Sequence, residues 1–333
     1  MNVPIPRQQR SSLPRCVCAV NGKGGTGKTS TTANQAALCA AGGMRVLVID
    51  MDPQGNLCTD LGYKQLPEFD GGRAFAAALV GWGELAFMRG VRPNLDVICG
   101  GMELLKIVPS LMTMAADQYR FRLLDILQPY AADYDIIFID TPPGTPALQE
   151  IALTTSRYAY IPTRTDVASI DEGVANIAGV FADVRQHTNP DLTLLGVVIV
   201  ATTFQGEKVR TVVDEESGET RNEVIPATAR MRAIRERIEL ILGEAAPVYR
   251  SHVRYVEAAA VDARAGGQLA HELEQEVLSG PSWVEQLRNP ELRSHRLASS
   301  QSAAGLAGDY QNITTETLHY IREHEERLAG AVA

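Results

Sequence analysis

The chain of 333 residues contains no run of about 18 consecutive apolar residues, the length that a membrane-spanning helix requires. Its first fifteen residues are polar and include proline, without the apolar stretch of a secretion signal. Cysteine is scarce, with five residues in the chain. The number is odd, and no two cysteines have the CxxC spacing. These absences argue against a membrane protein, a disulfide framework and a zinc site, and they predict a protein of the reducing cytoplasm.

Basic residues are not in excess either, because 31 Lys and Arg face 40 Asp and Glu, giving a formal net charge of -9. The molecule as a whole is therefore not a basic coat for nucleic acid. Any DNA binding needs a local patch, or an oligomer that gathers basic residues. The hydrophobic content of 45% and the charged content of 21% are ordinary for a globular protein.

Short apolar runs alternate with helical patterns along most of the chain. The predicted strands are Cys16–Val20, Arg45–Ile49, Leu95–Cys99, Asp135–Ile139, Tyr158–Ile161 and Leu194–Ala201. The predicted helices between them include Thr29–Ala41, Tyr119–Gln128 and Ile170–Gln186. Several strands are continuous in Val, Ile and Leu, as in strands covered on both faces. The pattern predicts an α/β fold with a doubly wound, mostly parallel sheet flanked by helices, and ligands at the carboxyl ends of the strands.

Three segments depart from this alternation. Residues 1–15 form a short basic N-terminal arm, residues 16–280 form the main domain, and residues 281–333 form a linker and a helical C-terminal tail. Within the main domain, residues 206–223 have the composition of an inserted hairpin. Residues 294–308 have linker composition, and a weakly amphipathic helix is predicted at Thr314–Leu328. Its polar character leaves open whether this helix packs on the domain or frays, and we expect residues 294–333 to be dispensable for activity.

The run Gly22–Thr29 matches the pattern GxxxxGK[ST], directly after a predicted strand and directly before a predicted helix. Its glycines permit positive φ and a close approach of phosphate, so successive backbone N–H groups predict an anion site at the helix N-terminus. In such a P-loop, Lys28 neutralises the β and γ phosphates of ATP, and the Thr29 hydroxyl ligates Mg²⁺. The predicted nucleotide-binding residues are Gly24, Gly25, Thr26, Gly27, Lys28, Thr29 and Ser30.

Acidic residues end two of the predicted strands. Asp140 follows Ile136–Ile139, where an acid can hold Mg²⁺ through water, or can simply cap the next element. Asp50 and Asp52 follow Val46–Ile49, and their spacing places them on one face of an extended chain. We predict that Asp52 orients the attacking water, with Asp50 as its structural or Mg²⁺-shell neighbour. The alternative for both is a pair of turn-capping acids ahead of a proline. The predicted metal set is Thr29, Asp50 and Asp140.

Together these motifs resemble a known family. KGGTGKTS at 23–30, DMDPQGN at 50–56 and DTPPG at 140–144 resemble the ParA/Soj partition ATPases of the ParA/MinD superfamily, which carry a deviant Walker A P-loop. The resemblance covers roughly residues 14–280. It implies that Lys23 reaches across an ATP-bound dimer to the partner's phosphates, that Asp52 is the switch aspartate needed for hydrolysis, and that Asp140 is the Walker B acid. The implied catalytic residues are Lys23, Lys28 and Asp52.

The segment Ser251–Ala259 resembles the family's RNVRLSEAP segment and matches it at Val253, Arg254, Glu257 and Ala258, but not at its opening Arg-Asn or its closing Pro.

The resemblance implies an ATPase that dimerises with ATP, binds duplex DNA without sequence preference, and is released when a ParB-like partner stimulates hydrolysis. The cargo is a plasmid, phage or chromosome, and the ATP state is nucleoid-associated. The arginine-rich segment 228–264 supplies the predicted DNA-binding residues, Arg230, Arg232, Arg235, Arg237 and Arg254, although a solvated helix face is the alternative.

The principal alternative is a MinD-like or cargo-positioning ATPase that acts on another surface. The terminal stretch carries Glu323, Glu325 and Glu326, the wrong charge for an anionic bilayer, so no membrane partner is predicted. An iron–sulfur ATPase needs paired cysteines, which Cys99 alone does not supply. A tyrosine kinase of this superfamily would need a terminal tyrosine cluster. A binding module without hydrolysis is disfavoured by the presence of Lys28, Asp52 and Asp140.

Overall fold

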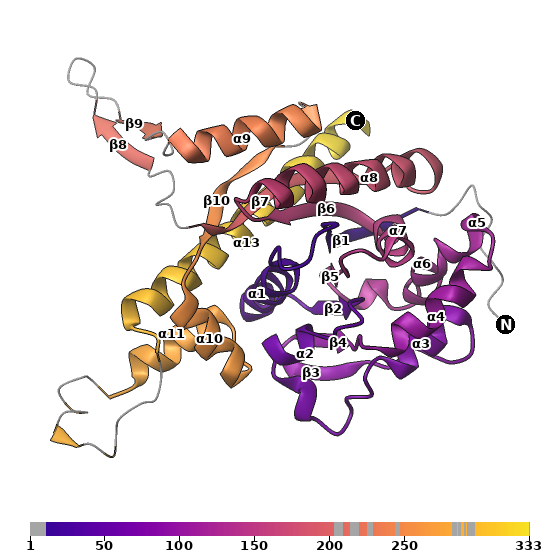
Figure 1. Ribbon diagram of the computed structural model, residues 1–333, viewed down its shortest axis with the longest axis horizontal. Helices are drawn as coiled ribbons and strands as arrows, with labels where there is room; N and C mark the ends of the chain where they lie inside the picture. Colours follow the sequence, from indigo (N-terminus) through magenta and orange to yellow (C-terminus); the bar gives the residue numbers. More distant parts are fainter. Residues whose placement is uncertain are drawn as a thin grey trace.

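The computed structural model describes residues 11–202, 209–213, 220–224, 229–243, 247–281, 285, 288–289, 291 and 297–332. Its centre is an eight-stranded sheet in the order β10-β7-β6-β1-β5-β2-β4-β3 (Figure 1). The strands are β1 (Leu13–Ala19), β2 (Val46–Asp50), β3 (Met88–Arg92), β4 (Leu95–Ile98), β5 (Ile136–Asp140), β6 (Ser156–Thr163), β7 (Thr193–Thr202) and β10 (Val248–Arg254). Neighbouring strands are parallel except β3 and β4, so the predicted mostly parallel sheet is confirmed.

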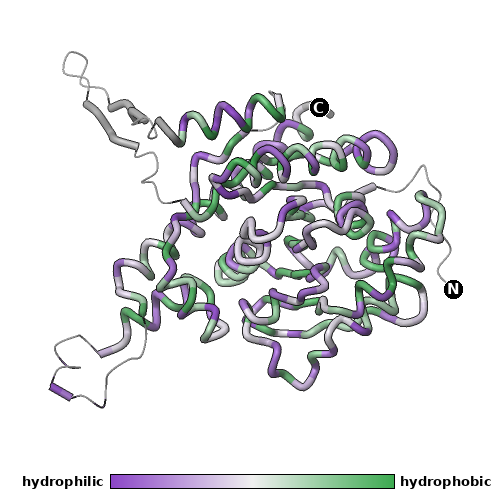
Figure 2. Tube along the Cα trace, in the orientation of Figure 1, coloured by the Kyte–Doolittle hydropathy of each residue, from purple (hydrophilic) through white to green (hydrophobic). Residues whose placement is uncertain are grey.

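Helices cover both faces of the sheet (Figure 1). One face packs on α3 (Arg73–Val80), α4 (Glu103–Met112), α5 (Ala116–Tyr119), α6 (Arg122–Leu127), α7 (Pro146–Thr155), α8 (Ala175–His187) and α9 (Ala229–Leu242). The other packs on α1 (Lys28–Ala41), α2 (Leu57–Asp60), α10 (Glu257–Gly266), α11 (Ala270–Ser279) and α13 (Ser300–Val332). Figure 2 shows hydrophobic residues recurring along the strands and along these helices. Strands β2 and β5 are buried throughout, which is why their sequences are continuously apolar.

All six predicted strands are present, whereas two of the predicted helices differ in detail. The segment Tyr119–Gln128 is divided, because α5 ends at Tyr119 and α6 begins at Arg122. The segment Ile170–Gln186 opens with a π-helical turn, η4 (Ser169–Val174), before α8 begins. Two short 3₁₀ turns complete the regular structure, η2 (Tyr63–Gln65) and η3 (Ala131–Asp133). All five cysteines are buried thiols.

The predicted insertion does contain a hairpin. Strands β8 (Val209–Val213) and β9 (Thr220–Val224) pair antiparallel in a sheet of their own, and Figure 1 shows them projecting from the main body. Residues 214–219, which join the two strands, lie outside the described residues. At the chain start, Arg15 belongs to β1 and not to the arm, while residues 1–10 lie outside the described part.

The C-terminal tail is more helical than the sequence predicted. Helix α13 begins at Ser300 and not at Thr314, so the prediction of a linker is wrong for residues 300–308. This helix packs against α11, β10 and α1, and its residue Ile313 is fully buried. The physical reason is that Ala303 and Ala307, which suggested a linker, are buried in the interface where α13 packs on the core. Among the described residues no helix is long and apolar enough to cross a membrane.

Candidate nucleotide-binding site

The glycine-rich loop lies between β1 and α1, at the carboxyl edge of the sheet. Gly25 has φ 73° and Gly27 has φ 79°, the left-handed region that favours glycine. Gly24 does not have positive φ, so the close approach of phosphate to the backbone is the remaining predicted reason for a glycine there. Gly27 precedes α1 without a side-chain hydrogen bond to cap it, so the first backbone N–H groups of α1 remain available for an anion.

Asn21 fastens this loop to the sheet and was missed by the sequence analysis. Its side chain is fully buried; Nδ2 donates to the Pro162 carbonyl at 2.8 Å, and Oδ1 accepts from the Lys23 N–H at 2.9 Å. A Cβ atom on Gly173 would lie 2.5 Å from that Oδ1, so the π-helical turn can approach only because this residue is glycine. A buried amide directly after an apolar strand is the one local signal that could have identified it.

Lys28 lies underneath the loop. It is 5% exposed, and its ammonium donates to the Lys23 carbonyl at 3.1 Å. Burial lowers the pKa of Lys28, and the nearby carboxylates of Asp140 and Asp52 oppose that shift. The side chain is thus already turned into the loop where a phosphate would lie, near Asp140 and Asp52.

Asp50 and Asp140 are register partners at the ends of β2 and β5, and both are fully buried. Within the described residues neither oxygen of Asp140 has a hydrogen-bond partner, and Asp50 uses only Oδ1, which accepts from the Asp52 N–H at 2.9 Å. Burial raises the pKa of Asp140 to about 7, opposed by the Thr29 hydroxyl and the Lys28 ammonium. Burial and the charge of Asp140 also raise the pKa of Asp50. Both oxygens of Asp140 and the Oδ2 of Asp50 are buried polar atoms that call for a proton, a cation or ordered water.

Asp52 belongs to the loop that follows β2. It is 5% exposed, and its Oδ1 accepts from the Gln54 N–H at 2.9 Å. Burial raises the pKa of Asp52, whereas the Gln54 hydrogen bond and the charge of Lys28 lower it. The structure therefore places Asp52 and Asp140 close enough to Lys28 for their charges to act on it, and their catalytic roles stay predictions.

Lys23 lies on the outer side of the loop and forms an ion pair with Asp166 at 2.8 Å. The two side chains are 36% and 48% exposed. Ser169 donates to Asp166 from its N–H at 2.9 Å and its hydroxyl at 2.7 Å, and together with Lys23 it holds the pKa of Asp166 below its usual range. No local pattern identified Asp166, which follows β6 far along the chain.

Two predicted nucleotide ligands have their hydroxyls engaged elsewhere. The Ser30 hydroxyl donates to Asp60 at 2.9 Å, and the Thr26 hydroxyl donates to the Lys23 carbonyl at 3.3 Å. Their contribution to an anion site is therefore limited to backbone N–H groups in this arrangement.

The predicted DNA-binding arginines whose side chains are described differ in their contacts. Arg232 on α9 is exposed, and Arg235 is half-buried with Nη2 donating to the Arg250 carbonyl at 3.2 Å. Arg237 is exposed and forms a two-hydrogen-bond ion pair with Asp171. Arg254 donates to both oxygens of Asp309 on α13, at 2.7 and 2.8 Å. Arg230 is the second residue of α9, but its side chain lies outside the described part of the structure.

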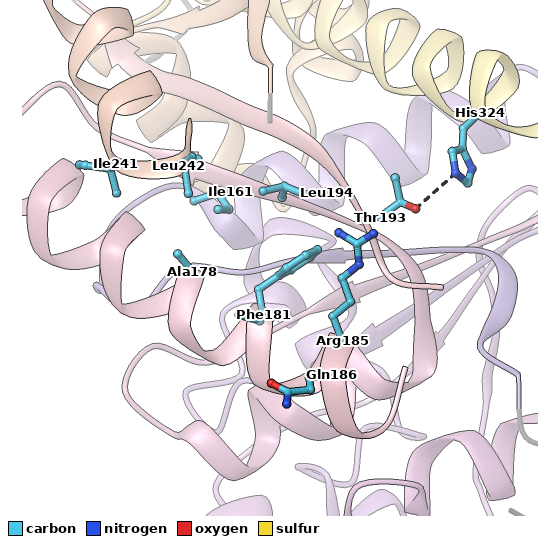
Figure 3. Close-up of a pocket in the computed structure, with 11 residues that line it drawn as sticks. Ile161, Ala178, Phe181, Arg185, Gln186, Thr193, Leu194, Ile241, Leu242 and His324 are labelled. Carbon is cyan, nitrogen blue, oxygen red and sulfur yellow. Dashed lines mark hydrogen bonds between the residues drawn. The ribbon is translucent and has the colours of Figure 1, made fainter. Parts of the chain in front are cut away.

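A cavity of about 650 Å³ lies away from this loop (Figure 3). Its apolar walls include Phe181 of α8, Leu194 of β7 and Ile241 of α9. At its polar end His324 of α13 contacts the Thr193 hydroxyl at 3.4 Å. Thr193 begins β7, whereas the glycine-rich loop lies where the strands end, so this cavity is not part of the nucleotide site.

A glycine-rich loop between a parallel strand and a helix, with a buried lysine and buried acids at the ends of adjacent strands, defines a P-loop nucleoside triphosphatase. Comparison with known proteins narrows the class. A family described as an AAA domain matches residues 14–194. The chromosome partitioning protein ParA of Myxococcus xanthus is 32% identical over 222 residues, which are 64% of this chain and 74% of that protein. The chain belongs to the ParA family of partition ATPases.

Two further comparisons agree with this assignment. The sporulation initiation inhibitor protein Soj of Bacillus subtilis is 31% identical over 193 residues, 56% of this chain and 72% of that protein. A plasmid partition protein of Borrelia burgdorferi, solved with AMPPNP, superposes with a TM-score of 0.60 at 16% identity, covering 92% of this chain and 99% of that one. At this identity the structural likeness is one of fold.

Proposed function

We propose that this ParA-family ATPase partitions DNA by a nucleotide-driven cycle. ATP closes a homodimer, the dimer binds duplex DNA without sequence preference, and a ParB-like DNA-binding partner stimulates hydrolysis and release. The observation that carries the proposal is that two lysines of one loop differ in burial. Lys28 is buried under the loop for the chain's own nucleotide, while the side chain of Lys23 is 36% exposed and paired with Asp166, from where it can serve a second copy.

ATP and Mg²⁺ are the cofactors, and the donor set fits them. Mg²⁺ prefers hard oxygen ligands and keeps several waters, and the site offers the Thr29 hydroxyl and the unpartnered oxygens of Asp140, with Asp50 behind them. No cluster of three or more His, Cys, Asp or Glu side chains around a metal is found among the described residues, consistent with an ion that also needs phosphate oxygens. When bound, Mg²⁺ supplies charge neutralisation to the transferred phosphoryl group.

The remaining chemistry falls to three side chains. Lys28 neutralises phosphate charge from within the loop, and the Asp52 carboxylate, held at one oxygen by Gln54, orients the attacking water. In the dimer Lys23 leaves Asp166 and approaches the partner's phosphates. An ion pair with both side chains more than a third exposed contributes only about 0–1 kcal/mol, so this exchange is inexpensive.

DNA binding rests mainly on α9. Arg232 is exposed and Arg235 lies on the same helix, so two copies in a dimer present these residues twice. Arg254 is engaged with Asp309 and Arg237 with Asp171, and we therefore assign them lesser roles at DNA.

The test is DNA affinity as a function of salt concentration in the ATP-bound state. Each phosphate contact contributes about 0.9 to the slope of log affinity against log salt. Arg232→Glu with Arg235→Glu should weaken DNA binding and flatten the slope, while ATP hydrolysis without DNA is unchanged. Arg73→Glu, which reverses an exposed arginine of α3, is the control and should leave the slope as it is. If the wild-type ATP-bound protein does not bind DNA at low salt, the partition cycle is wrong.

A further inference from the structure

The short helix α2 directly follows the loop that carries Asp52, and a residue from the far end of the chain holds it. Arg264, in the last turn of α10, donates from Nη2 to Asn56 Oδ1 at 2.8 Å. Its Nη1 lies 3.5 Å from Asp60 Oδ1. Asn56 precedes α2 and Asp60 ends it, so one guanidinium contacts both ends of the segment that continues the Asp52 loop.

Asp60 extends this contact to the phosphate-binding helix. Its Oδ2 accepts from the Ser30 hydroxyl at 2.9 Å, and Ser30 is adjacent to Thr29. Asp60 is only 6% exposed, so its charge needs compensation, and Arg264 is the cation in contact with it. Burial raises the pKa of Asp60, and Arg264 and Ser30 oppose that shift. The four side chains thus connect α1, the Asp52 loop and α10.

Polar contacts add to packing in this arrangement, because Leu57 and Leu61 are buried in the core while the Asp60 carboxylate faces a cavity. A cavity of about 130 Å³ lies beside Asp60 and Arg264 and is also lined by Leu306 and Tyr310 of α13. No close-packed apolar wall therefore holds the Asp60 carboxylate on that side, and its position depends on Ser30 and Arg264.

The ends of α2 and α10 are joined separately by backbone contact. A Cβ atom on Gly62 would lie 2.8 Å from the Gly267 carbonyl oxygen, so the two backbone segments pass at a distance that only glycine permits. Arg92 of β3 donates to the Leu61 carbonyl at 2.9 Å and to the Gly267 carbonyl at 3.0 Å, and it pairs with Glu272 at 2.5 Å. This junction provides stability, but Arg92 touches neither Asn56 nor Asp60 in these contacts.

We propose that Arg264 is a positioning residue for ATP hydrolysis, which sets the Asp52 loop against the phosphate-binding helix through Asn56 and Asp60. The inference rests on the proposed role of Asp52. Arg264 itself is 49% exposed at its side chain and does not touch the nucleotide loop, so it acts through the two residues that it contacts. A displaced Asp52 loop leaves the phosphate-binding residues in place but misplaces the attacking water.

The first experiment separates positioning from structure. Arg264→Gln should lower kcat on the order of tenfold or more while ATP affinity and Tm stay at wild-type values, because a small misplacement is costly for a water-orienting group. Arg264→Lys restores a charge near Asp60 but cannot serve both partners, so kcat should recover only in part. Arg92→Gln should instead lower Tm with kcat closer to wild type, and Arg73→Gln should change neither.

A double-mutant cycle then tests the route. Because Arg264 contacts both Asn56 and Asp60, the variant Asn56→Ala with Arg264→Gln should lose less of kcat than the two single losses combined. Additive losses would overturn the route, as would a wild-type kcat in Arg264→Gln. A Tm loss in Arg264→Gln that accounts for the whole fall in kcat would show a structural role only. If Asp52→Ala is slow but Arg264→Gln is not, this inference alone fails; if Asp52→Ala hydrolyses ATP at the wild-type rate, the role of Asp52 fails first.

Discussion

Removal of α13 should unfold the protein and not merely detach a tail. The helix buries Leu306, Ile313 and Ile321 at 5%, 0% and 4% exposure, along with Tyr310. At about 1.5–3 kcal/mol for each buried aliphatic side chain, those three alone contribute about 4.5–9 kcal/mol. That is comparable with the whole unfolding free energy of an ordinary domain, about 5–15 kcal/mol. The truncation also exposes the surfaces of α11 and β10 that α13 covers.

The assay is chemical denaturation of point variants, since a chain ending at Ser299 should be insoluble. Ile313→Ala should lower the unfolding free energy by about 2–5 kcal/mol, the range for aliphatic side chains in packed cores. Gln311→Ala, an exposed position of the same helix, should stay within about 0.5 kcal/mol of wild type. A chain ending at Ser299 that is soluble, folds cooperatively and hydrolyses ATP would refute the conclusion that α13 belongs to the core.

Three further predictions concern the site. Lys28→Ala should lose ATP binding in a titration calorimeter, because the buried phosphate partner is removed; retained affinity would contradict its role. Asp52→Ala should retain ATP affinity but slow hydrolysis by about two to three decades in a phosphate-release assay, so that the ATP-bound dimer accumulates. Burial raises the pKa of Asp140 to about 7, above its unfolded value of about 4, so its contribution to the stability of the ligand-free protein falls as pH rises from about 4 to 7. Asp140→Asn should therefore raise Tm more at pH 8 than at pH 5, and an equal gain at both would be inconsistent with that shift.

The sequence predicted those features whose causes are local. A glycine-rich run between an apolar strand and a helix defines its own conformation, which is why the loop around Lys28 was located correctly. The proximity of Asp50 and Asp140 also followed, since the carboxyl ends of parallel strands meet at one edge of a sheet.

Contacts between distant segments were not predicted. Asp166 reaches Lys23, and Arg264 reaches Asn56, across large sequence separations that no periodicity encodes. The start of α13 was wrong for another reason. Small residues such as Ala303 and Ala307 serve equally in a linker and in a closely packed helix face, and only the surface opposite them decides which.

The most direct test of the central claim is the ATPase rate per molecule, measured over a range of protein concentrations for the wild type and for Lys23→Ala. If Lys23 completes the site of a second copy, the wild-type rate per molecule should rise with concentration as dimers form. Lys23→Ala should bind ATP as tightly as the wild type, yet remain slow at every concentration. A rate per molecule that is independent of concentration, and equal in Lys23→Ala and the wild type, would contradict the account.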